Sequence, residues 1–158
     1  MAKQMEATRI FDAPVETVWE VWKDPELVKR WWGTKFFTSN LAKIDFKEGG
    51  KTLVSTKEPK ETGGHEYFTV WEYVKIIHLK KIEFIQNPAD EAGNKTDPVK
   101  LGMPSDFPSN VKTVVTFQEV GKNKTEMTIA KYAEFGSMSN FAQIALDQSM
   151  EKMEAMFY

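Results

Sequence analysis

Hydrophobic and polar positions change their spacing along the chain, and each spacing predicts a different element. Near the start, "VETVWEVWK" and "PELVKRWW" place apolar residues three and four apart, as on one face of a helix. Farther along, apolar residues alternate with polar ones, as in strands with one buried face. The last stretch returns to the helical spacing. The pattern predicts a strand at 4–11, two short helices, about six further strands and one long final helix.

The two short helices carry recognisable start and stop residues. Asp12 precedes Pro14, and proline is favoured at the first position of a helix. Asp24 and Pro25 repeat this signal, and an N-cap aspartate accepts hydrogen bonds from the free N–H groups of the first turn. Gly33 can end the second helix in a left-handed turn. We therefore expect two helices in tandem.

The alternating segments predict antiparallel strands joined by short turns. "LAKIDFKEGGKTLVST" is typical of a hairpin, because the glycines of "EGGK" tolerate positive φ. "HEYFTVWEYVKII" and "HLKKIEFIQ" predict two more strands, and "VKTVVTFQEV" with "KTEMTIAKYAEF" predicts a closing hairpin. Residues 87–110 form the main irregular segment and hold four of the seven prolines. A loop of this length inside a domain is often functional.

The final helix has an apolar stripe at the helical period, formed by Ala142, Leu146, Met150, Met153 and Phe157. Asp147 and Glu151 fall on the opposite face, while Phe141 and Ile144 lie beside the stripe and require a flanking contact. Hairpin-connected strands with one long amphipathic helix indicate an α+β fold. We expect residues 1–158 to form a single domain, in which the helix lies in the concave side of a curved antiparallel sheet.

Composition and charge narrow the range of partners. Apolar residues make up 41% of the chain and aromatic residues 13%, enough for a sizeable core or an aromatic-lined cavity. The net charge is −2 and no Lys/Arg run exceeds two residues, which argues against nucleic acid and against an anionic membrane. No stretch has the length of a membrane span or the pattern of a signal peptide, so we expect a cytoplasmic protein. The absence of cysteine excludes disulfides and thiolate chemistry.

Several of these segments together resemble a known superfamily. "FDAPVETVWEVWKDPELVKRWWG", "KIDFKEGGK", "VTFQEV", "KTEMTI" and "LDQSMEKM" are similar to the START-like or Bet v 1-like superfamily, also called SRPBCC. Within it they are most similar to the branch named after the activator of the 90-kDa heat-shock chaperone's ATPase. The resemblance covers roughly residues 8–157. It implies a helix-grip fold of six to seven strands with a cavity beneath the last helix.

The resemblance also implies three kinds of function. Members bind lipids, sterols, polyketides or other hydrophobic molecules, and a few are cyclases or hydrolases. The branch name points to a chaperone partner, although the eukaryotic activator carries an additional N-terminal domain without a counterpart among these residues. We expect non-catalytic binding of a small hydrophobic molecule, with a chaperone cofactor or an enzyme of the same fold as alternatives.

The inward positions of the strands and of the last helix predict the cavity wall. These positions are Trp32, Phe46, Val54, Tyr67, Trp71, Phe84, Phe117, Met127, Ile129, Leu146, Met150 and Met153. Thr52 and Thr56 are unusually polar for inward positions and, with Tyr67, could orient the polar end of a ligand. Of the adjacent Trp31 and Trp32, either one fills the core while the other flanks the cavity mouth, or both fill the core.

Few residues favour catalysis or a metal site. His65 and His78 open successive antiparallel strands and should lie far apart, so we expect neither a metal nor another cofactor. No serine has the context of a nucleophile elbow. Glu72 shares its strand face with apolar residues and could act as a general acid or base if buried, or could equally form a salt bridge at an edge. We therefore assign no catalytic residue.

Overall fold

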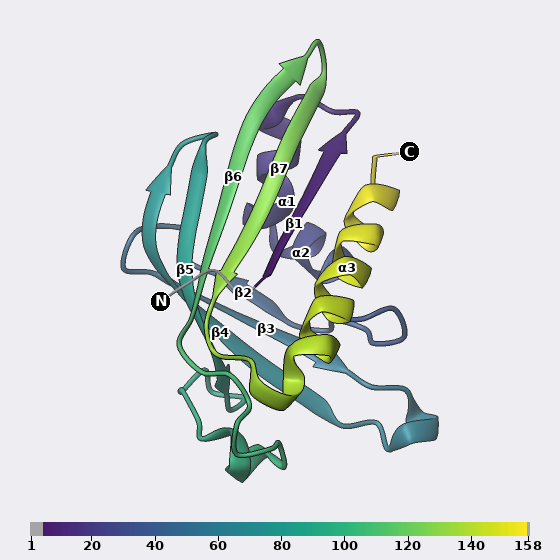
Figure 1. Cartoon of the computed structure of the whole chain (residues 1–158), viewed down its shortest axis with the longest axis vertical. Helices are drawn as coiled ribbons and strands as arrows, with labels where there is room; N and C mark the ends of the chain where they lie inside the picture. Colours follow the sequence, from purple (N-terminus) through teal and green to yellow (C-terminus); the bar gives the residue numbers. More distant parts are fainter. Residues whose placement is uncertain (1–4, 158) are drawn as a thin grey trace.

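The computed structural model describes residues 5–157, which form one antiparallel sheet with helices on its concave side (Figure 1). The elements in chain order are β1 (Met5–Phe11), α1 (Val15–Lys23), α2 (Pro25–Trp31), β2 (Ala42–Ile44), β3 (Lys51–Lys57), η1 (Lys60–Thr62), β4 (Glu66–Ile77), β5 (Lys81–Ala89), η2 (Pro98–Leu101), β6 (Val111–Gly121), β7 (Lys124–Tyr132), η3 (Gly136–Met138) and α3 (Ser139–Ala155). The order and type of the predicted elements are confirmed.

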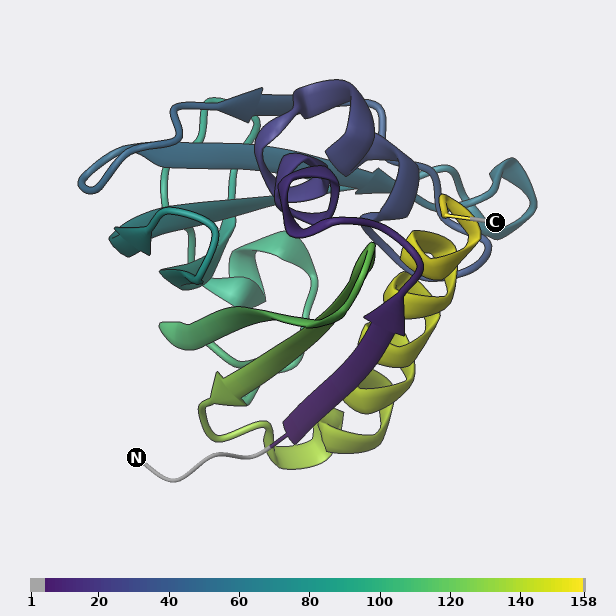
Figure 2. The same cartoon turned by 90° about the horizontal axis from the view of Figure 1, so that it is seen from above.

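The sheet has seven strands in the order β1-β7-β6-β5-β4-β3-β2, and every neighbouring pair is antiparallel. The first strand therefore lies beside the last one, with Ala7 opposite Ile129. The register shifts once in the β4–β5 pair and once in the β6–β7 pair, and such irregularities bend the strands. Seen from above, the strands curve around α3 (Figure 2). The predicted α+β helix-grip architecture is confirmed.

The two short helices differ in how they begin. Asp24 caps α2 as expected, because its side chain accepts a hydrogen bond from the Glu26 N–H at 2.9 Å. A helix does begin after Pro14 as expected, but Asp12 does not cap it: α1 begins at Val15 and has no side-chain cap. Asp12 instead accepts a hydrogen bond from the Lys124 ammonium at 2.7 Å, which ties the start of the helical segment to the β6–β7 hairpin.

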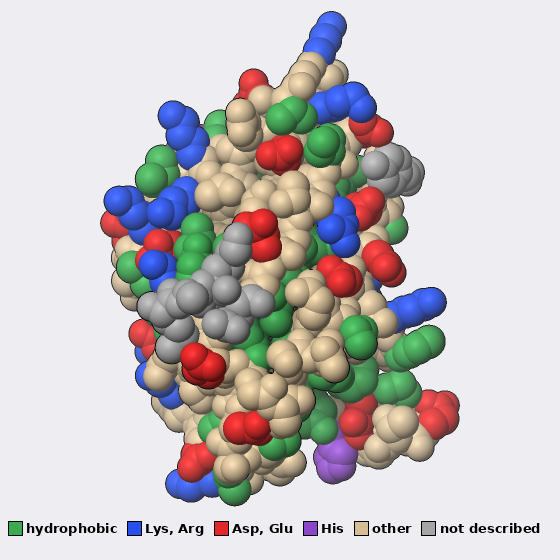
Figure 3. Space-filling model, viewed as in Figure 1, with side chains coloured by type: hydrophobic (Ala, Val, Ile, Leu, Met, Phe, Trp, Pro, Cys, Tyr) green, Lys and Arg blue, Asp and Glu red, His purple; other side chains and the backbone are tan. Residues whose placement is uncertain are grey.

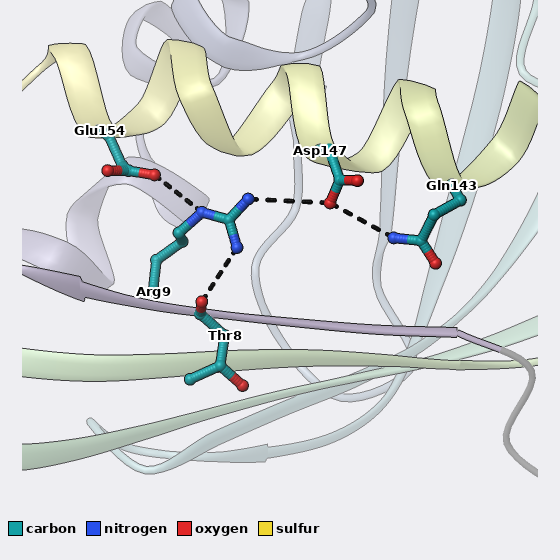
Figure 4. Close-up of polar contacts among 5 residues, drawn as sticks. All are labelled: Thr8, Arg9, Gln143, Asp147 and Glu154. Atoms are coloured by element: carbon teal, nitrogen blue, oxygen red, sulfur yellow. Dashed lines mark hydrogen bonds and ion pairs between the residues drawn. The ribbon is translucent and has the colours of Figure 1, made fainter.

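The long helix α3 is held at the edge of the sheet by polar contacts. Arg9 on β1 donates from Nε to the Glu154 carboxylate at 2.7 Å, and its guanidinium lies 3.7 Å from Asp147 (Figure 4). The Gln143 side chain also donates to Asp147, at 3.3 Å. The helical period sets Asp147 apart from the apolar stripe, and the structure directs it toward the edge strand, where it meets the Arg9 cation.

The irregular segment is shorter than predicted. β5 continues through Pro88 to Ala89, so the connection to β6 comprises residues 90–110 and contains the short helix η2. This connection lies beside the beginning of α3, at the lower end of the molecule in Figure 1. Together with the first half of α3, it covers this end of the sheet.

No helix within residues 5–157 is long and apolar enough to cross a membrane. On the face drawn in Figure 3, acidic and basic side chains are interspersed, without one large area of a single sign.

Candidate ligand-binding cavity

A cavity of about 400 Å³ lies between the sheet and the first half of α3. Its floor is the end of β7, the start of β6 and the end of β5, whose inward positions are occupied by Ile129, Val111 and Phe84. The first half of α3 and residues 102–108 close it on the other side. This volume falls within the range of known small-molecule sites.

Small residues on α3 leave this space open. Ala142, Ala145 and Ser149 face the cavity from the helix, where longer side chains would reach the sheet. Farther along the same helix, Met153 is fully buried and does not line the cavity. The short side chains thus help to keep the space between helix and sheet open, while Leu146 and Met150 of the same helix also form part of its wall.

The two adjacent tryptophans take different places in the structure. Trp31 is 1% exposed and donates from Nε1 to the Val21 carbonyl at 2.7 Å, so it belongs to the core. Trp32 is only partly buried, and its ring meets Trp71 edge to face at 5.1 Å between centroids. Both rings contribute to the cavity wall. Thus Trp31 fills the core and bounds the cavity from inside, while Trp32 bounds it nearer the surface.

Gly33, directly after these rings, is required by geometry. Its φ is +104°, a conformation that residues with a Cβ rarely adopt. A Cβ at this position would also lie 2.7 Å from Cγ2 of Thr56, far inside van der Waals contact. Glycine therefore lets the segment after α2 pass close to β3 and form part of the wall.

The predicted wall residues divide into two groups by their position along the sheet. Six of the twelve line the cavity: Trp32, Tyr67, Phe84, Ile129, Leu146 and Met150. The other six do not line it and belong to the packed core: Phe46, Val54, Trp71, Phe117, Met127 and Met153. These residues face the interior as the alternation predicts, but they meet other core side chains instead of open space, as Trp71 does where it stacks on Phe84 with 4.7 Å between ring centroids.

Of the expected polar wall residues, Thr56 and Tyr67 lie at the cavity and Thr52 does not. Thr52 is fully buried and shares a hydrogen bond with the Tyr73 hydroxyl at 2.5 Å. Burial, with the nearby Glu58 carboxylate, raises the pKa of Tyr67 above its ordinary value. Tyr67 is therefore a neutral phenol at physiological pH.

Sequence reasoning missed the most unusual wall residue, Lys131. It lies on β7 two residues after Ile129 and points inward with it, opposite Thr113 of β6. Its ammonium donates to Gln86 Oε1 at 3.0 Å and to Thr113 Oγ1 at 3.2 Å. The alternation of Met127, Ile129 and Lys131 was the available signal, because it places a lysine on the apolar side of the strand.

Burial lowers the pKa of Lys131 from its ordinary value to about 8. The side chain is half-buried and lines the cavity. Its two hydrogen-bond partners are neutral, and no carboxylate among the described residues forms an ion pair with it. The site therefore contains a cation whose charge is not compensated.

Residues 102–108, from the β5–β6 connection, are fastened to the beginning of α3. Asp106 accepts hydrogen bonds from the backbone N–H of Ser137 at 2.8 Å and from its hydroxyl at 2.9 Å. These bonds lower the pKa of Asp106 below its ordinary value. Met103 and Phe107 of this segment face the cavity, so the contact holds two apolar side chains over the opening.

The remaining chemical candidates lie outside the cavity. Glu72 falls on the outer face of β4, because its neighbours Trp71 and Tyr73 are the ones that point inward. His78 packs edge to face against Trp19, with 5.8 Å between ring centroids, and His65 lies beside Glu58 near η1. Within residues 5–157 no three His, Cys, Asp or Glu side chains are grouped so as to hold a metal ion.

A curved antiparallel sheet around a C-terminal helix, with a cavity beneath it, defines a helix-grip protein of the START/Bet v 1-like class. The chain matches the family described as "Activator of Hsp90 ATPase homolog 1-like protein" over residues 12–157, and it belongs to that family. The resemblance inferred from the sequence is confirmed. No curated protein matches the chain.

Several solved structures share this fold. A protein from Arthrobacter aurescens is 24% identical with a TM-score of 0.80, over 96% of this chain and 84% of that one. A Mycobacterium smegmatis protein is 21% identical with a TM-score of 0.72, over 97% and 89%. The AHSA1 protein from Silicibacter pomeroyi is 14% identical with a TM-score of 0.74, over 98% and 96%. At these identities the likeness supports the fold.

Proposed function

We propose that the protein binds a small, largely apolar molecule in the cavity between the sheet and α3, without catalysing its conversion. The observation that carries this proposal is the cavity itself, about 400 Å³ in volume and bounded mainly by aromatic and aliphatic side chains. Water molecules can form few hydrogen bonds with such an apolar wall. An apolar ligand is bound favourably there, because binding removes its own apolar surface and that of the wall from solvent.

The cavity wall offers a direct optical readout of binding. Trp22, Trp31 and Trp32 all face it, so an apolar dye in the cavity should accept excitation energy from tryptophan. Titration with the neutral dye N-phenyl-naphthylamine should give saturable energy transfer with one binding site per chain. Linear, non-saturating uptake would contradict the proposal.

Two neighbouring positions on α3 provide a matched pair of variants. Ala145→Phe places a ring in the cavity and should abolish saturable dye binding. Ile144→Phe adds a ring one residue away, at a position that is 53% exposed and lies off the wall, and should leave binding unchanged. Equal loss in both variants would show that the dye binds elsewhere on the helix.

The family name favours a second candidate, a chaperone cofactor acting through its surface. In that case the purified protein should bind the 90-kDa heat-shock chaperone and stimulate its ATPase, and Ala145→Phe should retain this stimulation. A cytoplasmic location, which both functions share, is part of the proposal.

A further inference from the structure

We propose that the natural ligand is an organic monocarboxylate, with its head group on the Lys131 ammonium and its apolar body in the remainder of the cavity. This inference rests on the proposed function and adds the chemical class of the ligand. It follows from the position of one cation in an otherwise uncharged wall.

The hydrogen bonds of Lys131 leave room for a ligand oxygen. An ammonium has three N–H donors, and the side chains of Gln86 and Thr113 accept two of them. Both partners reach Lys131 from neighbouring strands β5 and β6 and hold its nitrogen at the sheet. All three side chains face the cavity, so the remaining donor is available to a molecule inside it.

No carboxylate within residues 5–157 forms an ion pair with this cation. In the sheet, Lys131 pairs with Met5 of β1 on one side and with Thr113 of β6 on the other. Beyond Thr113, its ammonium reaches Gln86 of β5. Of the described wall residues from all elements, including α3 and residues 102–108, only Tyr67 and Lys131 can titrate, and the phenol stays neutral. The acidic residue on the nearby part of α3, Asp147, is directed to Arg9 instead.

A carboxylate fits this arrangement better than other head groups. A buried cation is unfavourable unless it is paired, so a ligand with one negative charge gains the attraction that the protein itself withholds. A dianion such as a phosphate monoester would bring a second, uncompensated charge into an apolar space. A neutral head group would gain one ordinary hydrogen bond, which is weaker than a charge-assisted one.

The proposal predicts a preference among ligands that differ only in the head group. Decanoate, decanol and decylamine share one apolar chain and can each compete with N-phenyl-naphthylamine. The wild-type protein should bind decanoate about tenfold or more tightly than decanol, as expected for a charge-assisted hydrogen bond in the interior. Decylamine should bind more weakly than decanol, because two like charges would meet at Lys131.

Two lysine variants separate the effect of this site from that of net charge. Lys131→Met should remove the preference for decanoate and leave decanol binding equal or improved. Lys112→Met makes the same change of charge on the neighbouring strand β6, at an exposed position outside the cavity, and should keep the preference.

The pH dependence tests the same point in the wild-type protein and needs no variant. Burial lowers the pKa of Lys131 to about 8, so the free site is cationic below this pH and neutral above it. Decanoate keeps its charge throughout this range. Its affinity should therefore fall as pH rises through 8, by up to about tenfold per pH unit, while decanol affinity stays constant.

The outcomes distinguish this inference from the proposed function. If decanol and the dye bind but decanoate shows neither a preference nor a fall above pH 8, the carboxylate assignment is wrong and the binding function stands. The carboxylate assignment is equally wrong if Lys131→Met keeps the preference. If neither the dye nor any of the three ligands binds, both proposals fail together.

Discussion

The two ends of the space beneath the sheet are built from the same strands and the same helix, yet one is filled and the other is hollow. At the filled end, Trp19 of α1 packs against Phe46 and Phe117, with ring centroids 5.6 and 5.1 Å away, and Met153 of α3 is fully buried. At the hollow end, α3 presents the short side chains of Ala142 and Ala145 to the sheet. The short side chains of α3 thus contribute to the cavity at this end.

The two ends also differ in their polar groups. At the filled end, the buried hydroxyl groups of Thr52 and Tyr73 share a hydrogen bond with each other. The hollow end keeps Lys131 with only neutral partners. A methionine at this position would be more favourable for stability than an unpaired lysine, which is consistent with a role for Lys131 in ligand binding. The two ends should therefore respond differently to comparable substitutions.

The largest contrast should come from removing an aromatic ring at each end. Trp19→Ala should lower the free energy of unfolding by about 3–5 kcal/mol, because it leaves a hole in a close-packed cluster. Phe107→Ala, in the segment over the cavity, should lower it by less than about 1 kcal/mol, since this ring already borders open space. Urea denaturation of both variants measures the difference. Similar losses would mean that the cavity end is as tightly packed as the other.

This contrast also explains which features of the cavity wall could be predicted from the sequence. The alternation in "KTEMTIAKYAEF" predicts Met127 and Ile129 on the same inner face, and the structure agrees. The alternation has a period along the strand but says nothing about what covers each end. Met127 contacts a tryptophan, whereas Ile129 borders the cavity. This difference depends on how α1 and α3 cross the sheet, which is a tertiary property. The twelve predicted wall residues therefore turn inward as expected but divide between core and cavity.

Two features of the cavity wall were not predicted from the sequence, for different reasons. Lys131 could have been found, because the same alternation carries it inward, but the usual preference of lysine for solvent hides this signal. The approach of Met103 and Phe107 could not, since the Asp106–Ser137 contact joins residues far apart in the chain. Loop placement of this kind has no periodic signal.

The next contrast concerns the energetic cost of Lys131. Its pKa of about 8 in the folded protein, against about 10.4 in the unfolded chain, corresponds to at most about 3 kcal/mol of destabilisation at pH 7. At a pH between these two pKa values, Lys131 is more protonated in the unfolded chain than in the folded protein. The free energy of unfolding should therefore rise with pH through this window. Lys131→Met should be more stable than the wild type at pH 7 and should lose this rise. Denaturation at pH 7, 8, 9 and 10 provides the measurement, and parallel curves for the two proteins would contradict it.

A smaller effect should separate two insertions of the same ring. Val18 of α1 is fully buried at the filled end, so Val18→Phe should cost about 1–3 kcal/mol by overpacking. Ala145→Phe adds a larger increment of volume but directs it into the cavity, and we expect it to cost less than about 1 kcal/mol or to stabilise. Urea denaturation compares the two variants. The reverse order, with the larger cost at Ala145, would show that the cavity cannot accept a ring.

The smallest contrast lies along α3 itself, where Arg9 forms contacts toward both ends (Figure 4). Glu154, 2.7 Å from Arg9, belongs to the half of the helix that packs on the core, whereas Asp147, 3.7 Å away, belongs to the half over the cavity. Both pairs are partly exposed, so each substitution should cost less than about 1 kcal/mol. In the packed half, buried side chains hold the helix even without the ion pair, so Glu154→Gln should leave dye release unchanged in stopped-flow measurements. In the half over the cavity fewer contacts hold the helix, so Asp147→Asn should accelerate release. Equal release rates in the two variants would mean that α3 moves as one rigid unit and that ligand exchange depends on the segment at 102–108 instead.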